Sequence, residues 1–327
     1  PGNDHRLGAN EAPPALISIF LGEQLEDIVE QILENGTASH SNKGEKMDIG
    51  VHTILPIKKD ATDRNRTSPF AFTGNKFEFR MVASSMSIAG ANTVLNATVA
   101  DVLQTMADKL EKADDFDKAV DEVIYETLKA HRKVIFNGNG YSDEWIAEAE
   151  RRGLPNVKTM VDATASLFDP KTIEMFERQH VFNKTELESR AEINYEAYAK
   201  AINIEAKTMI EMASKQYIPA VISYVTSLAD SINSISAACA EADLSVQKDL
   251  LTKCSSLLAE AQKALNDLVA ADAKANSMEE GKEQAEFYRD TVFSAMSELR
   301  APIDELEMLV DKEFWPVPSY GDLIFEV

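Results

Sequence analysis

The sequence has 327 residues, of which 44% are hydrophobic and 27% charged, so it is long enough for two or three folded domains and too apolar for a disordered chain. Its formal net charge of −22 argues against a general nucleic-acid or anionic-membrane binder, because a phosphate surface needs a basic partner. We therefore expect no nucleic-acid and no membrane partner, and any site for anions must be a local basic pocket.

The two cysteines, Cys239 and Cys254, fall in helical patterns and cannot form the disulfide framework of a small secreted protein. This favours a reducing, cytoplasmic location. The apolar run near the start, residues 15–21, is too short to span a bilayer. Because the sequence opens on Pro1, directly inside a motif and without a methionine, we expect it to be the C-terminal part of a longer polypeptide.

The beginning of the chain alternates loops with short apolar segments. Residues 1–14 lack periodicity and predict a loop, in which Arg6 and Glu11 are the chemically interesting side chains, although composition alone favours a solvated charged loop. Beyond this loop the pattern predicts a buried strand over residues 15–21 and an amphipathic helix over 23–34. A second short strand is predicted over 51–57.

The segment NRTSPFAFTGNKFEFR combines a polar cluster with alternating charges and aromatic rings. Side chains alternate between the two faces of a strand, so Lys76, Glu78 and Arg80 are predicted to share one face. Phe77 and Phe79 point to the other face, where they are expected to anchor the strand in a core. A carboxylate between two cations suits a polyanion together with a metal ion. A simple salt bridge explains the same pattern, so both interpretations stay open.

Further along, the pattern becomes helical. One helix is predicted to bury a face whose apolar side chains recur at spacings of three and four: Leu95, Val99, Val102, Leu103, Met106 and Leu110. A second helix follows over roughly 116–133. Residues 137–140 (NGNG) predict a turn and not a phosphate loop, since they lack the Lys-Ser/Thr pair of that motif. Ser142 and Asp169-Pro170 each start a further helix.

The C-terminal half is almost wholly helical, beginning with a capping box predicted for Thr185 and Glu188. Long amphipathic helices separated by short polar breaks predict an antiparallel up-down bundle over 184–313. The bundle has no buried carboxylate–histidine pattern, so a structural or assembly role is its simplest interpretation. The aromatic, proline-containing tail 314–327 is expected to dock on the body of the protein or on a neighbouring subunit.

The sequence lacks the patterns of hydrolytic, thiol and zinc centres. The five histidines are not at metal-binding spacing, no serine lies in a nucleophile elbow, and neither cysteine has an evident base partner. The candidate functional residues that remain are Arg6, Glu11, Arg66, Lys76, Glu78 and Arg80.

Three ordered motifs resemble glutamine synthetase: HRLGANEAPP at 5–14, NRTSPFAF at 65–72 and KFEFR at 76–80. Common members of that family carry KRLVPGYEAP, NRSASIR and RIEVRF in the same order. The variants GANEAPP and TGNKFEFR, the segment VIFNGNGYSDEW and the C-terminal YGDLIFEV are similar to the large type III branch. The motif resemblance is strongest in the first third of the chain.

The resemblance implies how glutamate and ammonia would be held. Arg6 and Arg80 would bind substrate glutamate. Glu11 would lie on the flap that closes the site and would accept a proton from ammonium. Arg6 and Glu11 are one residue closer together here than in the common pattern, which implies a flap of different construction.

The resemblance also implies the phosphoryl end of the site. Arg66 would face the transferring γ-phosphoryl group of ATP and the glutamate, Lys76 would bind phosphate, and Glu78 would ligate a divalent metal, Mg²⁺ or Mn²⁺. Ala71 stands where many members carry a further phosphate-binding arginine. The other metal ligands of the family would lie upstream of Pro1.

By the same resemblance we expect an α+β fold, part of a glutamine-synthetase-type catalytic domain with antiparallel strands and helices, followed by a long antiparallel helical bundle. The C-terminal part of the catalytic domain is expected over residues 1–112, followed by a helical connecting region over 113–183. The bundle is expected over 184–313 and the docking tail over 314–327.

The implied function is ATP-dependent ligation of ammonia to the γ-carboxylate of L-glutamate through γ-glutamyl phosphate, in a ring-shaped homo-oligomer whose sites a neighbouring subunit completes. Two alternatives stay open. A γ-glutamyl–amine ligase of the same superfamily would use another acceptor, although Glu11 favours ammonia. A non-catalytic assembly or regulatory module is supported weakly by the long acidic bundle.

Overall fold

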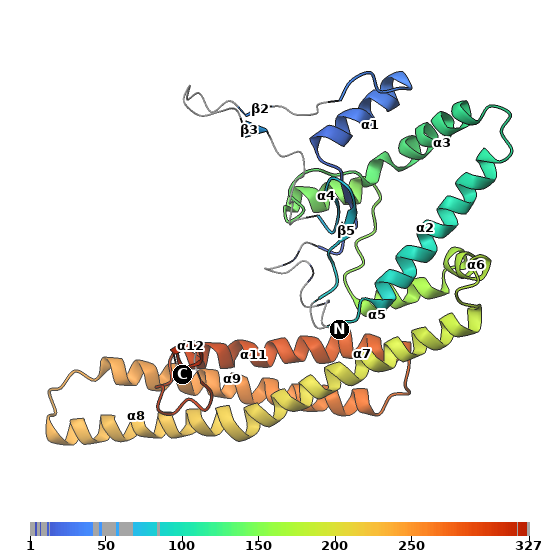
Figure 1. The fold of residues 1–327 in the computed structure, drawn as a ribbon. Coiled ribbons are helices and arrows are strands. Elements are labelled where there is room, and N and C mark those ends of the chain that lie inside the picture. Colours follow the sequence, from blue (N-terminus) through green and yellow to red (C-terminus); the bar gives the residue numbers. More distant parts are fainter. Residues whose placement is uncertain are drawn as a thin grey trace. The chain divides into compact units, whose positions relative to one another are not determined.

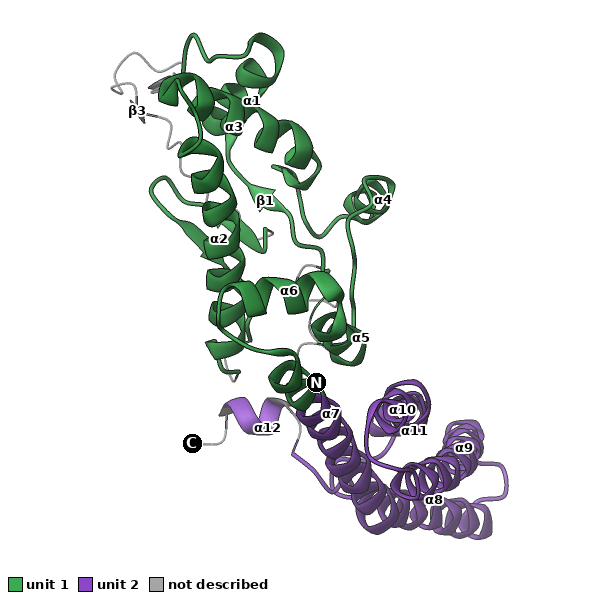
Figure 2. Ribbon diagram, turned by 90° about the vertical axis from the view of Figure 1, so that its right-hand side faces the viewer, with its two compact units in different colours: residues 1–191 green, residues 192–327 purple. Residues whose placement is uncertain are grey.

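The computed structural model describes residues 4, 7, 12, 14–41, 46–47, 57–58, 68–83, 86–318 and 320–325. The chain divides into two compact units, Pro1–Ala191 and Glu192–Val327, which are coloured separately in Figure 2. The strand predicted for 51–57 lies outside the described residues except for Ile57. Helices dominate both units and a small sheet lies in the first (Figure 1), so the α+β class is confirmed at this coarse level.

The sheet of the first unit has three short strands: β1 (Ile19–Phe20), β4 (Phe70–Phe72) and β5 (Phe77–Phe79). Its order is β1-β4-β5, with β4 in the middle. The pairing of β4 with β5 is antiparallel, as predicted, whereas β1 pairs with β4 in parallel. The expectation of antiparallel strands is therefore wrong for β1, because a long connection separates β1 from β4 and lets them run in the same direction.

A second, two-stranded pairing is antiparallel and joins β2 (Lys46–Met47) to β3 (Ile57–Lys58). The predicted strand over 15–21 forms over only two residues, Ile19–Phe20, and Ile17 is exposed.

A segment far along the chain lies against β1. Ile135 forms a parallel bridge with Ile19, whose carbonyl oxygen accepts a hydrogen bond of 3.0 Å from the backbone N–H of Phe136. The side-chain Oδ1 of Asn137 then accepts from the backbone N–H groups of Leu21 and Gly22, at 2.9 and 3.0 Å. The turn predicted at 137–140 thus begins with an asparagine that satisfies the backbone where β1 ends.

A small core covers this edge of the sheet, formed by Leu16, Trp145, Ala149 and Leu154. The Trp145 ring stacks on Phe136 with 3.7 Å between ring centroids. A Cβ atom at Gly138 would come within 2.5 Å of the Phe136 ring, so the close approach of that ring requires glycine there.

The helices of the first unit carry the capping signals that the sequence predicts. Ser142 Oγ accepts from the backbone N–H of Trp145, and Pro170 occupies the first turn of its helix after the N-cap Asp169. In chain order the helices are α1 (Glu23–Asn35), α2 (Ala89–Leu110), α3 (Phe116–His131), η1 (Arg132–Val134), α4 (Asp143–Arg151), α5 (Met160–Ala165), η2 (Ser166–Phe168) and α6 (Pro170–Arg178).

Helix α2 buries a different face from the predicted one. Ala97 packs with Phe176 and Leu187, whereas Val99 and Leu103 of the predicted inward face are 54% and 58% exposed. The periodicity correctly marks an apolar stripe, but the pattern of one helix does not say which face its neighbours cover. In the structure, α6 and the start of α7 cover the opposite face.

The helices that continue into the second unit are α7 (Lys184–Met212), the π-helical turn η3 (Ala213–Tyr217), α8 (Ile218–Ala238), α9 (Ser245–Asn276), α10 (Lys282–Phe287), the π-helical turn η4 (Tyr288–Val292), α11 (Phe293–Glu307) and α12 (Tyr320–Phe325). The capping box at the start of α7 uses Asn183 and Glu186, which exchange hydrogen bonds of 2.9 Å, and not the predicted Thr185 and Glu188.

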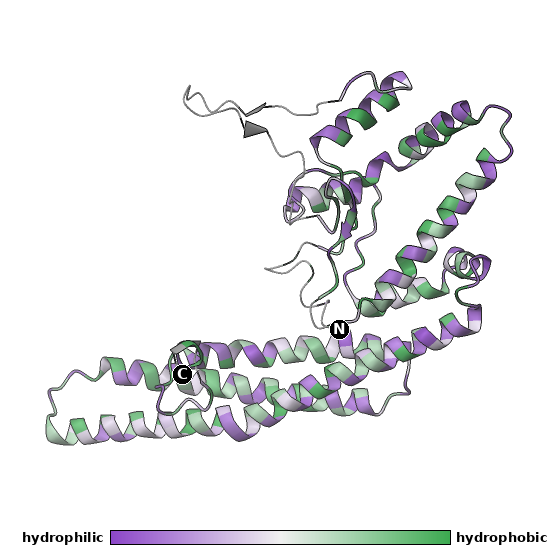
Figure 3. Ribbon diagram, in the orientation of Figure 1, coloured by the Kyte–Doolittle hydropathy of each residue, from purple (hydrophilic) through white to green (hydrophobic). Residues whose placement is uncertain are grey.

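Helix α9 packs against both α8 and α11 and supplies much of the core of the second unit. Leu268 on α9, Leu299 on α11 and Val221 on α8 are fully buried. Apolar and polar residues are interleaved along these helices (Figure 3), as expected where each helix buries one side. Within the described residues, no helix combines the length and the apolar character needed to cross a membrane.

The end of α4 is fixed to the sheet edge by a charged cluster. Glu148 accepts hydrogen bonds of 2.6 Å from Arg151 and from Arg152, and Arg152 also donates to the backbone oxygen of Ile135 at 3.0 Å. The two arginines lower the pKa of Glu148 to about 2, from 4.5. The carboxylate therefore stabilises the folded state above pH 4.5, and this contribution is lost as the pH falls towards 2.

We predict that Glu148→Gln lowers the melting temperature at pH 7, since the neutral amide loses both charge-assisted hydrogen bonds. The difference from the unsubstituted chain should shrink below pH 4.5 and vanish near pH 2. Thermal unfolding followed by circular dichroism across this range measures it. Glu150→Gln, at an exposed position on the same helix, is the matched control and should be neutral. A difference that does not depend on pH would contradict the assignment.

Candidate functional site

The candidate site lies on the hairpin formed by β4 and β5. The register places Ala71 opposite Glu78, and the turn at 73–76 closes with a hydrogen bond of 2.9 Å from the Thr73 N–H to the Lys76 carbonyl oxygen. Gly74 in this turn has φ +94°, a conformation that favours glycine. The turn chemistry therefore fixes the register, and the register fixes the face on which Glu78 lies.

The structure brings Lys76, Glu78 and Arg80 together, as strand alternation predicts. The Nζ atom of Lys76 lies 3.2 Å from Oε1 of Glu78. Arg80 donates two hydrogen bonds to the other carboxylate oxygen, Oε2, from Nη2 at 2.7 Å and from Nε at 3.1 Å. These bonds from Arg80, and then the one from Lys76, hold the pKa of Glu78 below its usual value.

The cluster is accessible to solvent. The Glu78 side chain is 36% exposed, Lys76 is more exposed and Arg80 less. Two cations and one carboxylate give this face a local net charge of about +1, although the chain as a whole carries −22. It is therefore the kind of local basic site that an acidic chain needs in order to bind an anion. An incoming phosphate or carboxylate would compete with Glu78 for the Lys76 and Arg80 donors.

The aromatic face of the hairpin differs from the prediction in one respect. Phe77 is 48% exposed and does not anchor a core, whereas Phe79 is half-buried. Phe77 instead stacks on Phe70, with 5.4 Å between ring centroids, and Phe79 meets Phe70 edge-on at 6.1 Å. The fully buried residue of the hairpin is Ala71 on the central strand, which pairs with Glu78 and therefore lies on the charged face.

Three of the six candidates, Arg6, Glu11 and Arg66, lie outside the described residues, and their roles stay predictions. Ser68, which follows Arg66 closely in the sequence, is almost fully buried, and its Oγ has no hydrogen-bond partner in the described part of the chain. An unsatisfied buried hydroxyl is unfavourable by about 1–3 kcal/mol. In the sequence, Ser68 is one of several polar residues in the NRTS cluster and nothing singles it out. Its burial in the structure does.

The described residues do not by themselves form a metal site. In that part of the chain, no group of three or more His, Cys, Asp or Glu side chains is placed to hold a metal ion. Glu78 offers oxygen atoms of the type that Mg²⁺ and Mn²⁺ prefer, but both of them face cations. A metal at Glu78 would therefore need further ligands from residues other than the described ones.

Comparisons with known proteins identify the family that the chain resembles. Residues 119–236 match the family described as the glutamine synthetase C-terminal domain. The chain is 38% identical to the type-3 glutamine synthetase of Dictyostelium discoideum, over 99% of its own length and 45% of that protein. It is 40% identical to the glutamine synthetase of Butyrivibrio fibrisolvens, over 100% of the chain and 46% of that protein.

A glutamine synthetase of Bacteroides fragilis is similar at 37% identity over 99% of the chain and 46% of its own length. The resemblance to the glutamine synthetase family is thereby confirmed, and it extends through the whole chain and not only through the three motifs. The predicted type III branch agrees with the name of the Dictyostelium relative. The chain spans less than half the length of the curated relatives it matches.

Proposed function

We propose that this chain forms part of a glutamine synthetase that ligates ammonia to L-glutamate. A γ-carboxylate oxygen of glutamate attacks the γ-phosphorus of ATP, and ADP leaves. Ammonia then attacks the carbonyl carbon of γ-glutamyl phosphate, and phosphate leaves to give glutamine. The observation that carries this proposal is the identity of 37–40% to three proteins named glutamine synthetase, over 99–100% of the chain.

The hairpin cluster supports a role at the phosphoryl end of such a site. Transfer of a phosphoryl group develops negative charge on oxygen, which fixed cations stabilise without a protein nucleophile. Lys76 would bind phosphate, and Arg80 would hold a glutamate carboxylate with its planar guanidinium. Both side chains already bind a carboxylate, that of Glu78, so each is positioned for an anionic group.

The remaining roles rest on the motif resemblance. Arg6 would bind glutamate together with Arg80, and Arg66 would contact the transferring phosphoryl group and glutamate. Glu11 would take a proton from ammonium, so that the neutral amine can attack. Glu78 would provide one oxygen ligand to Mg²⁺ or Mn²⁺, a metal that neutralises phosphate charge when bound. The other ligands would come from polypeptide that the structure does not describe.

The helical half of the chain suits an assembly role. We assign residues 184–313 to an antiparallel bundle that helps to hold a ring of subunits, with each site completed by a neighbouring subunit. The packing of α9 against two other long helices supports the bundle. The proposal also keeps the division of the chain into four regions, at residues 1–112, 113–183, 184–313 and 314–327.

We predict that Glu78→Gln, in the complete polypeptide that carries residues 1–327, lowers metal-dependent γ-glutamyl transfer by more than about 100-fold. The amide keeps the size of the side chain and can still accept a hydrogen bond from Arg80, but it loses the charge that a divalent cation needs. Colorimetric detection of γ-glutamyl hydroxamate measures the effect. Glu34→Gln, at the exposed end of α1, is the control. Near-normal activity of Glu78→Gln would refute the ligand role.

The assembly proposal has a separate test. Light scattering coupled to size-exclusion chromatography should show that the complete polypeptide has the molar mass of an oligomer of several subunits. A monodisperse monomer at micromolar concentration would contradict a ring with shared sites, and it would leave the activity prediction untouched.

A further inference from the structure

One side of helix α2 is apolar and uncovered by the described part of the chain. Ile88, directly before the helix, is 62% exposed, and Val99, Val102 and Leu103 are 54%, 46% and 58% exposed. Val99 comes about three turns after Ile88, and Val102 and Leu103 follow at spacings of three and four, so the four side chains share one side of the helix. We call these four residues the α2 face. It extends for about 22 Å along the helix, at 1.5 Å per residue.

The segment that carries the α2 face also lacks the charges of a solvated helix. Residues 81–100 contain no Asp, Glu, Lys or Arg, although 27% of the whole chain is charged. The first charged residue after them, Asp101, is already paired with Arg178, whose Nε lies 2.7 Å from Oδ1. A helix whose outer side meets water usually carries charged and polar side chains there. The composition of α2 is therefore that of a helix covered on both sides.

The first unit does not supply that cover from its described residues. Ala97 is the one buried residue among the 22 of α2, and none of the 16 residues of α3 is buried. In the second unit, by contrast, α9 buries seven side chains against its neighbours. An apolar helix side that faces water in a folded unit indicates a surface that contacts further polypeptide.

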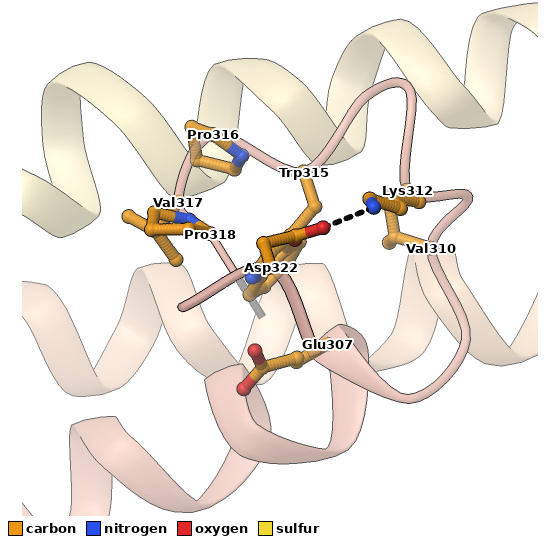
Figure 4. A pocket seen from close by; sticks show the side chains of 8 residues that line it. All are labelled: Glu307, Val310, Lys312, Trp315, Pro316, Val317, Pro318 and Asp322. Carbon is orange, nitrogen blue, oxygen red and sulfur yellow. Dashed lines mark hydrogen bonds and ion pairs between the residues drawn. The ribbon is translucent and has the colours of Figure 1, made fainter. Parts of the chain in front are cut away.

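The C-terminal tail shows how the second unit covers its own helices. The ring of Trp315 packs on Tyr217 of η3, with 5.1 Å between ring centroids. Figure 4 shows the tail folded over these helices, with the ion pair between Lys312 and Asp322 as a dashed line. The tail thus docks on the body of its own unit, one of the two outcomes that the sequence left open. It leaves the α2 face without a comparable cover.

The length of the relatives indicates what the missing cover is. The three relatives match 99–100% of this chain, yet more than half of each relative lies outside the matched region. A protein of this family therefore has enough further polypeptide to cover a helix of 22 residues. A second copy of this chain suits the face less well, because two chains that each carry a net charge of −22 repel one another.

We propose that the α2 face docks on polypeptide of the same protein chain that lies outside residues 1–327. That polypeptide presents an apolar surface at least about 22 Å long, the length of the exposed stripe. Ile88 follows Arg80 by only eight residues, so the same contact fixes the hairpin cluster relative to the rest of the protein. The proposal rests on the exposure and composition of α2 and on the length of the relatives, and it does not depend on the proposed reaction.

Cysteine labelling of the complete polypeptide tests whether the α2 face is covered. Leu103→Cys should react with a maleimide at least about 100-fold more slowly than Gln104→Cys, because only the first position is on the α2 face. Gln104 is exposed on another side of the same helix, which makes it the matched control. Mass spectrometry of the tryptic peptide 81–109 reads this position separately from the exposed Cys239. In denaturant the two variants should react alike. Equal rates in the folded protein would overturn the proposal.

Photo-cross-linking identifies the cover without any substitution. The complete polypeptide is produced with photo-leucine, a leucine analogue with a light-activated diazirine, and peptide 81–109 then carries it at Leu95 and Leu103. After irradiation, product with the mass of a single chain is isolated under denaturing conditions and digested. We expect peptide 81–109 joined to peptides from outside residues 1–327. The proposal is overturned if this peptide joins only other parts of residues 1–327, if its cross-links occur only in product of two chains, or if it forms none.

Discussion

The pairing of the central strand β4 with two neighbours is the constraint on which the candidate site depends. In the sheet register, Phe20, Ala71 and Glu78 lie side by side on β1, β4 and β5. Ala71 is fully buried between them. A shift of one residue in the pairing of β4 with β5 would turn Glu78 to the opposite face and exchange the charged side chains for phenylalanine rings. The hairpin turn at Gly74, closed by the hydrogen bond between Thr73 and Lys76, opposes that shift.

The charged cluster also illustrates how an acidic protein can hold an anion. The net charge of −22 would repel phosphate from most of the surface. Lys76 and Arg80 form a local exception, and Glu78 keeps them in place by accepting their hydrogen bonds. In the proposed function, Glu78 would exchange these contacts for a metal while the two cations turn to phosphate and glutamate. The same three residues therefore account for both the salt bridge that the structure shows and the site that the motifs imply.

Local sequence patterns predict the local features of this structure well. Strand alternation places Lys76, Glu78 and Arg80 on one face, and the capping side chains Ser142 and Asp169 begin helices where expected. Features that depend on distant residues are not predictable in this way. The parallel pairing of β1 with β4 and the contact of Asn137 with the end of β1 join segments that no local pattern connects. Likewise, the apolar stripe of α2 is visible in the sequence, but its exposure follows from where α6 lies.

In the proposed function, the central claim is that Glu78 belongs to a metal- and phosphate-binding site and is more than a partner for two cations. Electron paramagnetic resonance of Mn²⁺ titrated into the complete polypeptide tests this claim without requiring turnover. Glu78→Gln should weaken Mn²⁺ binding at one site by about tenfold or more, whereas Glu34→Gln should leave it unchanged. Equal Mn²⁺ binding by Glu78→Gln and the unsubstituted protein would contradict the claim, and Glu78 would then serve only to hold Lys76 and Arg80 in place.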